Sequence, residues 1–111
     1  MAIEAEVGVI RLLLFSEEHL THIQKEQILL VVSAANQNTY FVAVHSEILA
    51  ALGVPPETAD RIVLEHRHAG LNEASVALLD FARELAVEPT AISIDDWTRL
   101  RTHGYTEEQI L

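Results

Sequence analysis

The stretch that decides the fold is SAANQNTYFVAVHSEILAALG, Ser33 to Gly53. Its apolar residues recur at helical spacing, and it ends at a glycine, which is typical of a helix terminus. A polar group buried in such a tract loses about 1 to 3 kcal/mol unless it finds a hydrogen-bond partner. The centre of the stretch therefore indicates either a satisfied core network or a site. Its polar residues are Asn36, Asn38, Tyr40 and His45.

Helical spacing continues along the rest of the chain, so we expect an all-α fold in one domain spanning residues 1–111. The expected helices are Ile3–Phe15, a helix capped by Thr21 and Gln24 that runs to Ala35, Thr39–Gly53, a helix opened by Pro55 and Pro56 that runs to Glu65, a helix capped by Asn72 that runs to Ala86, and a helix capped by Asp95 that ends at Gly104. The segment TAISI, Thr90 to Ile94, alternates like a strand but is too short to form a sheet. Trp97 and Tyr105 are expected to be core or interface anchors.

The chain repeats itself weakly at a period of 51 residues, which predicts the same helix-loop-helix unit twice. The coinciding pairs are Leu20 and Leu71, Ile28 and Leu79, Leu49 and Leu100, and Gly53 and Gly104. The two units differ in chemistry at the polar positions of the first, so any site belongs to the first. Their replacements are Val87 for Asn36, Pro89 for Asn38 and Asp96 for His45. The second unit stops at Leu111 as its next helix begins, and we expect a homo-oligomer in which a partner chain completes the core.

Composition excludes several classes of function. Seventeen acidic against seven basic residues give a net charge of −10, which repels nucleic acid. No apolar run is long enough for a membrane span and no secretory signal is recognisable, so a cytoplasmic protein is expected. The chain has no cysteine, which excludes disulfides, iron–sulfur clusters and thiol nucleophiles. His19 and His22 are three apart near a helix start, and His66 and His68 are two apart, a spacing that sends helical side chains to different faces, so we expect no metal site.

Glu26 and His45 are the strongest candidates for chemistry. If the helices on either side of the NQN turn pack as an antiparallel hairpin, Glu26 approaches His45, which lies on an otherwise apolar stripe with Phe41 and Leu52. A carboxylate beside a partly buried imidazole can move protons near neutral pH. The alternative is a core histidine that is hydrogen-bonded to a neighbour.

The stretch EQILLVVSAANQNTYFVAVHSEILAALGV resembles the core motif of the alkylhydroperoxidase D-like proteins in the carboxymuconolactone decarboxylase superfamily, especially the branch called peroxidase-related. That motif has a glutamate, an apolar helix ending in Ser-x-x-Asn, then Cys-x-x-Cys-x-x-x-His and a leucine-rich turn to glycine. The segment LNEASVALLDFARELAVEPTAISIDDWTRLRTHGYTEEQIL is similar to the family's segment after the motif, so the likeness covers nearly the whole chain from Leu20. It implies an alkylhydroperoxidase D-like helical domain.

The resemblance implies roles for residues at matching positions. Glu26 and His45 match the catalytic proton-relay residues, while Ser33, Asn36 and Tyr40 match residues that lead into the motif and line its pocket. Asn38 and Phe41 stand where the family has its two cysteines. Peroxide reduction in that family needs one thiolate to take an oxygen and a second thiol to form a disulfide. The thiol peroxidase mechanism therefore cannot run in this chain.

Two classes of function remain open, and with them the question whether the chain is an enzyme. The first resembles the cysteine-independent decarboxylase branch, in which His45, oriented by Glu26, moves protons on a small carbonyl acid or lactone without a cofactor. The second is a cysteine-less helical oligomer that serves as a scaffold or binds a small ligand, with Asn38 and His45 satisfying each other. Dimers, trimers and hexamers would each suit either class.

Overall fold

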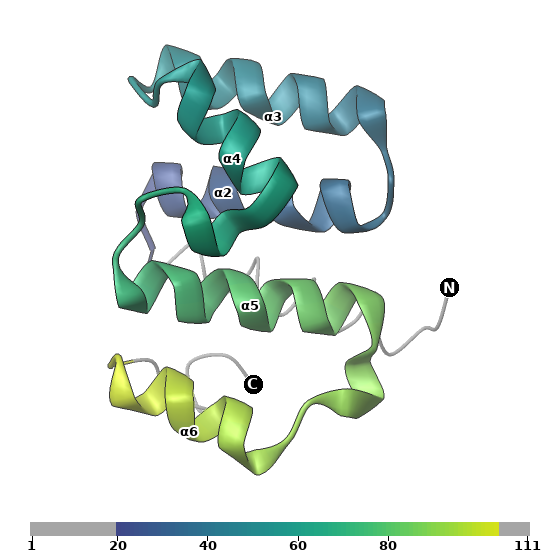
Figure 1. The fold of residues 1–111 in the computed structure, drawn as a ribbon, viewed down its shortest axis with the longest axis vertical. Helices are drawn as coiled ribbons and strands as arrows, with labels where there is room; N and C mark the ends of the chain where they lie inside the picture. Colours follow the sequence, from purple (N-terminus) through teal and green to yellow (C-terminus); the bar gives the residue numbers. More distant parts are fainter. Residues whose placement is uncertain (1–19, 105–111) are drawn as a thin grey trace.

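The computed structural model describes residues 20–104, which form five α-helices and two short 3₁₀ helices (Figure 1). The elements are α2 His22–Ala35, α3 Thr39–Ala51, α4 Pro56–Glu65, η1 His66–His68, α5 Glu73–Val87, η2 Pro89–Ala91 and α6 Ile94–Thr102. Of the described residues 79% are helical and none lies in a strand, so the predicted all-α fold is confirmed. The predicted helix Ile3–Phe15 lies outside the described residues, as do His19 and Tyr105.

The helices α2 and α5 form the middle of the fold, with α3 at one end and α6 at the other (Figure 1). The α2 helix packs against α3, α4 and α5, and α5 in turn packs against α6. Each of these α-helices contributes to the largest fully buried side chains, which are Ile28, Leu30, Leu49, Ile62, Leu78, Leu79 and Leu100. Burying each of them contributes about 1.5 to 3 kcal/mol to folding.

The predicted internal repeat is visible in the fold. The α2–α3 hairpin recurs as α5–α6, and α5 begins at Glu73, 51 residues after the start of α2 at His22. Equivalent residues are equally buried: Ile28 is 0% exposed and Leu79 is 1% exposed, while Leu49 is 0% and Leu100 is 1% exposed. The two copies therefore contribute the same apolar positions to one shared core.

Capping residues set where the first helix of each hairpin begins. The Thr21 N–H donates to Gln24 Oε1 at 2.9 Å, and the Gln24 N–H donates to Thr21 Oγ1 at 3.1 Å. This reciprocal capping box is the one predicted. The Asn72 side chain accepts from the Ser75 N–H at 2.8 Å, which confirms the predicted cap of α5.

The start of α6 differs from the prediction. Its N-cap is Ser93 and not Asp95. Ser93 Oγ accepts from the Asp96 N–H at 3.3 Å, and the Asp96 carboxylate accepts from the Ser93 N–H at 2.8 Å. A capping box uses residues three apart, and Ser93 has an acidic partner at that spacing, so the helix begins at Ile94. Thr90 to Ile94 accordingly forms the end of η2, a link and the first residue of α6.

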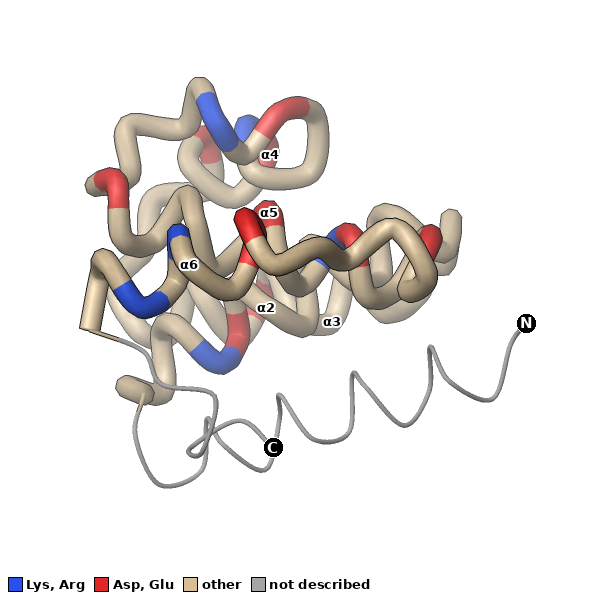
Figure 2. Tube along the Cα trace, turned by 90° about the horizontal axis from the view of Figure 1, so that it is seen from below, with Lys and Arg blue, Asp and Glu red and all other residues tan. Residues whose placement is uncertain are grey.

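An aromatic contact and an ion pair join α6 to α5, in addition to the buried Leu100. The rings of Trp97 and Phe81 meet edge to face with their centroids 4.8 Å apart, which places Trp97 against the core as predicted. The second contact is polar, because Arg99 on α6 donates to Asp80 on α5. Charges on α6 also complement its helix dipole, with acidic residues in the first turn and basic residues in the last (Figure 2).

None of the helices within residues 20–104 is long and apolar enough to cross a bilayer.

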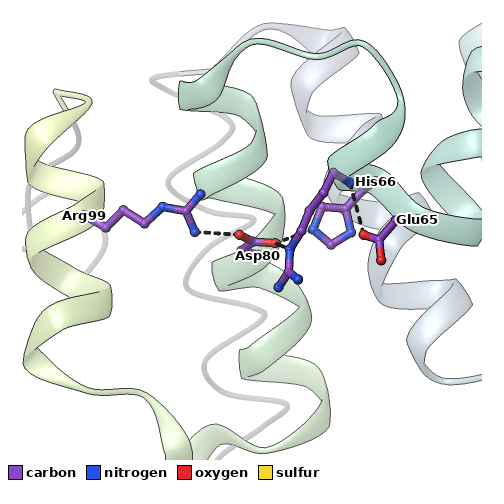
Figure 3. A network of polar contacts seen from close by, with 5 residues as sticks. Glu65, His66, Asp80 and Arg99 are labelled. Atoms are coloured by element: carbon purple, nitrogen blue, oxygen red, sulfur yellow. Dashed lines mark hydrogen bonds and ion pairs between the residues drawn. The ribbon is translucent and has the colours of Figure 1, made fainter.

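Asp80 is the centre of a polar network that joins η1, α5 and α6 (Figure 3). Its Oδ1 pairs with His66 Nε2 and accepts from Arg67 Nε at 3.0 Å, while its Oδ2 accepts from Arg99 Nη1. Burial, the largest single influence, raises the pKa of the Asp80 carboxyl. Hydrogen bonds from Arg99, His66 and Arg67 together outweigh it and hold that pKa below its ordinary value. The network therefore stabilises the folded chain when Asp80 is ionised.

We expect Asp80→Asn to lower the free energy of unfolding at pH 7 by about 1 to 3 kcal/mol. Because the pKa of Asp80 is lower in the folded chain, its contribution is present above the unfolded value of about 4 and is lost as the pH falls through the folded value. The difference between parent and variant should therefore shrink in acid. Urea denaturation at a series of pH values measures it, with Asp95→Asn as the control. Parallel stability curves for parent and Asp80→Asn would contradict this assignment.

Candidate functional site

The turn between α2 and α3 positions the candidate site. The Gln37 N–H donates to the Ala34 carbonyl and the Asn38 N–H donates to the Ser33 carbonyl at 2.9 Å, which is a Schellman ending for α2. Gln37 adopts a φ of 57°, in the left-handed region that this motif requires. The Asn38 side chain then accepts from the Phe41 N–H at 3.1 Å and caps α3. Asn38 thus ends one helix and begins the next, so α3 turns straight back along α2.

Glu26 and His45 meet across this hairpin, as the sequence predicts. Glu26 lies on α2 and His45 on α3, and His45 Nδ1 is 3.0 Å from Glu26 Oε2. The Glu26 side chain is 7% exposed and that of His45 is 15% exposed, so water screens the pair little. An ionised carboxylate only accepts, which makes Nδ1 the donor. Among residues 20–104 no group bonds His45 Nε2, so this nitrogen is left for a ligand or a proton.

Other side chains near the pair differ in exposure. His22 lies one turn before Glu26 on α2, with its Nε2 4.0 Å from Glu26 Oε1, and its side chain is mostly exposed. The Phe41 ring lies 6.2 Å from the His45 ring, centroid to centroid, on the turn of α3 before it. Tyr40 in turn contacts Phe41 with ring centroids 5.5 Å apart. The pair is therefore flanked by the titratable His22 on α2 and by two aromatic rings on α3, those of Tyr40 and Phe41, which we call the aromatic flank.

The aromatic flank is more exposed than its place on an apolar stripe predicts. Phe41 is 47% exposed and Tyr40 is 71% exposed. Both residues belong to the first turn of α3, which stands at the end of the fold and has α2 and α4 as its main neighbours in the described part of the chain. Phe41 is therefore not a core residue within the described part of the chain.

The remaining predicted residues have local roles. Ser33 Oγ donates to the Leu29 carbonyl at 2.7 Å, a bond common for serines within helices. Asn36 is exposed and forms the C-cap of α2, with its N–H directed to the Val32 carbonyl. The pairing of Asn38 with His45 is wrong, because Asn38 caps α3 and His45 pairs with Glu26. A pocket-lining role for Ser33, Asn36 and Tyr40 stays a prediction.

The Asp80 network is a titratable cluster that the sequence pattern did not predict. The spacing of His66 from His68 bears only on whether the two could share a metal, and it gives no sign of a bond to Asp80. Asp80 itself looks like an ordinary helix residue in the sequence. The available signal was a lone acid within the apolar run VALLDFA of α5. Within residues 20–104 no group of three or more histidine, aspartate or glutamate side chains is arranged to hold a metal ion.

Comparison of the chain with protein-family models and with curated proteins gives no match. The geometry of Glu26 and His45 is therefore the main evidence on function.

The hydrogen bond to Glu26 predicts the tautomer of His45. When the ring is neutral, we expect its proton on Nδ1, because the carboxylate accepts and cannot donate. Long-range ¹H–¹⁵N correlation spectra of the histidine rings distinguish the two tautomers. In Glu26→Gln the amide can donate as well as accept, so the preference for Nδ1–H should weaken. The exposed His68 should give the same spectrum in both proteins, and an Nε2–H tautomer of His45 in the parent would refute the pairing.

Proposed function

We propose that this chain is an alkylhydroperoxidase D-like protein of the carboxymuconolactone decarboxylase superfamily that performs cofactor-free proton transfer on a small carbonyl acid or lactone. The observation that carries the proposal is the shielded bond between Glu26 and His45, 3.0 Å long. These two residues match the relay positions of the family, and they lie on separate helices joined by the NQN turn. The residues between them supply no thiol.

In this proposal His45 is the catalytic residue and Glu26 is a positioning residue. Nε2 of the neutral imidazole takes a proton from the carbon beside a carbonyl, and the resulting imidazolium returns it elsewhere on the substrate. Glu26 fixes the ring through Nδ1 and stabilises the imidazolium as it forms. The exposed ring of Phe41 gives the substrate an apolar surface next to the imidazole.

The second candidate function is a helical oligomer without catalysis, and the exposure of α3 favours assembly in either case. Of the thirteen residues of α3 only Leu49 is buried, although nine of them are apolar. Tyr40, Phe41 and, on α4, Leu64 are large apolar side chains that remain exposed. Such a surface is typical of a protein interface, and we propose that a second copy of the chain covers α3.

Turnover of a lactone tests the enzymatic proposal. We expect the parent to isomerise or decarboxylate at least one member of a panel of small lactones that carry a carboxyl group, followed by NMR. His45→Ala should lose about 10²- to 10⁴-fold in rate, because the proton carrier is removed. Glu26→Gln should lose less and should change the pH–rate profile, since the carboxylate facing the imidazolium is gone.

Assembly and folding are the controls for that assay. The parent, His45→Ala and Glu26→Gln should give the same circular dichroism spectrum and the same mass by light scattering, and that mass should exceed one chain. If all three proteins fold and assemble alike and none turns over any lactone, the enzymatic proposal is wrong and the non-catalytic helical oligomer remains as the candidate function. A monomeric parent would contradict the proposed oligomer.

Restoring the thiols tests the family resemblance separately. Asn38→Cys combined with Phe41→Cys places two cysteines three residues apart at the N-terminus of α3, where thiolates are stabilised. We expect the double variant to reduce a small organic hydroperoxide with dithiothreitol as the electron donor, while the parent does not. The lost cap should cost about 1 kcal/mol of stability. A folded double variant that consumes no hydroperoxide above the level of either single variant would count against the resemblance.

A further inference from the structure

A cavity that is separate from the candidate site lies where the last turn of α2 meets the end of α4 and Arg83 of α5. Its volume is about 330 Å³, at the lower end of the range for small-molecule sites. It is lined by Val31, Ala34, Ala35, Ile62, Val63, Leu64, Glu65, His66, Arg67 and Arg83. None of these residues belongs to the Glu26–His45 pair. Ala34 is eight residues beyond Glu26 on α2, about 12 Å along the helix axis.

The inner part of this cleft is apolar. Val31 from α2 and Ile62 from α4 are buried, and Val63 is partly buried against the core. The two alanines that end α2, Ala34 and Ala35, have small side chains that leave space beside them. This surface fits the hydrocarbon part of a small ligand.

The outer part of the cleft is charged and mainly basic. Its charged lining residues are Arg67 and Arg83 against the single acid Glu65, which is opposite to the excess of acids in the chain as a whole, and the His66 ring is buried beside them. Arg67 and His66 are already bonded to Asp80 (Figure 3), and the Glu65 carboxylate accepts from the Arg67 N–H at 3.2 Å. These contacts fix one side of the cleft.

Arg83 is the lining cation whose donors are available. It projects from α5 and is exposed, and within the described residues 20–104 no carboxylate forms an ion pair with it. A guanidinium binds a carboxylate through two parallel hydrogen bonds. Since Glu65 repels an anion on its own side, the negative end of a ligand belongs beside Arg83.

We propose that this cleft binds a small organic carboxylate with an apolar body. The carboxylate pairs with Arg83, and the body lies on Ala34, Val63 and Leu64, which are the accessible apolar residues of the lining. The inference does not depend on the proposed function, because the cleft shares no residue with Glu26 and His45.

Binding of octanoate to the full chain tests the proposal, with octanamide as the uncharged probe of the same shape. We expect octanoate to shift the amide resonances of Ala34, Val63 and Leu64 in a saturable manner and to bind about tenfold more tightly than octanamide. Arg83→Gln should weaken octanoate binding about tenfold and leave octanamide binding unchanged. Arg61→Gln removes an exposed arginine of α4 that does not line the cleft, so its affinity should equal that of the parent.

A second pair of variants separates the cleft from the candidate site. Ala34→Leu, which fills the inner part, should abolish octanoate binding, whereas His45→Ala should retain it. Equal affinities for octanoate and octanamide, an unchanged affinity in Arg83→Gln, or resonance shifts confined to residues around His45 would each overturn the proposal. Circular dichroism spectra that match the parent show that the variants are folded.

Discussion

The carboxylate of Glu26 lies in the interface between α2 and α3, where an unpaired charge would lower the free energy of unfolding by roughly 3 to 5 kcal/mol. His45 is the side chain that offsets this cost, and it does so from the other helix. The bond therefore fixes how α3 lies against α2, and it requires the tight turn made by Gln37 and Asn38. Any chemistry at this place begins from an imidazole whose orientation is already set by folding.

Most of the fold could be predicted from local signals in the sequence. The capping box of Thr21 and Gln24 and the cap at Asn72 define where α2 and α5 begin, because they involve residues only three apart. The meeting of Glu26 with His45 also followed from local information, since a short turn between two helices leaves few ways to pack them. The cap of α6 was misplaced by two residues because Ser93 and Asp95 are both good capping residues, and the choice depends on the partner at Asp96.

Features that depend on distant residues could not be predicted in this way. Asp80 bonds His66, Arg67 and Arg99, which are 13 to 19 residues away in the sequence, and no local pattern predicts that these side chains meet.

The exposure of Phe41 was not predicted for a related reason. Helical periodicity places a residue on an apolar stripe, but it does not say whether another element of the same subunit covers that stripe. The end position of α3 in the fold leaves it open.

The repeat offers a way to separate the structural from the chemical role of the Glu26–His45 pair. In both hairpins an acid on the first helix bonds a base 19 residues later on the second helix, Glu26 with His45 and Asp80 with Arg99. Asp80 and Arg99 each lie three residues, nearly one helical turn, beyond Ala77 and Asp96, the repeat equivalents of Glu26 and His45.

An acid–base bond at this spacing thus holds the two helices of either hairpin together. If holding the helices together were its only role, arginine could supply the base in both copies. Arginine does not release its proton in proteins, whereas histidine does so near neutral pH. The first hairpin carries the base that can exchange a proton, and the bridge around that base is the more shielded of the two, since the Arg99 side chain is 47% exposed and that of His45 is 15% exposed. The comparison concerns only the two bridges that join the helices of a hairpin, because Asp80 also bonds the shielded histidine His66 of η1. Between these two bridges, the presence of histidine at the position where the other hairpin has arginine is the reason to look for proton chemistry at His45.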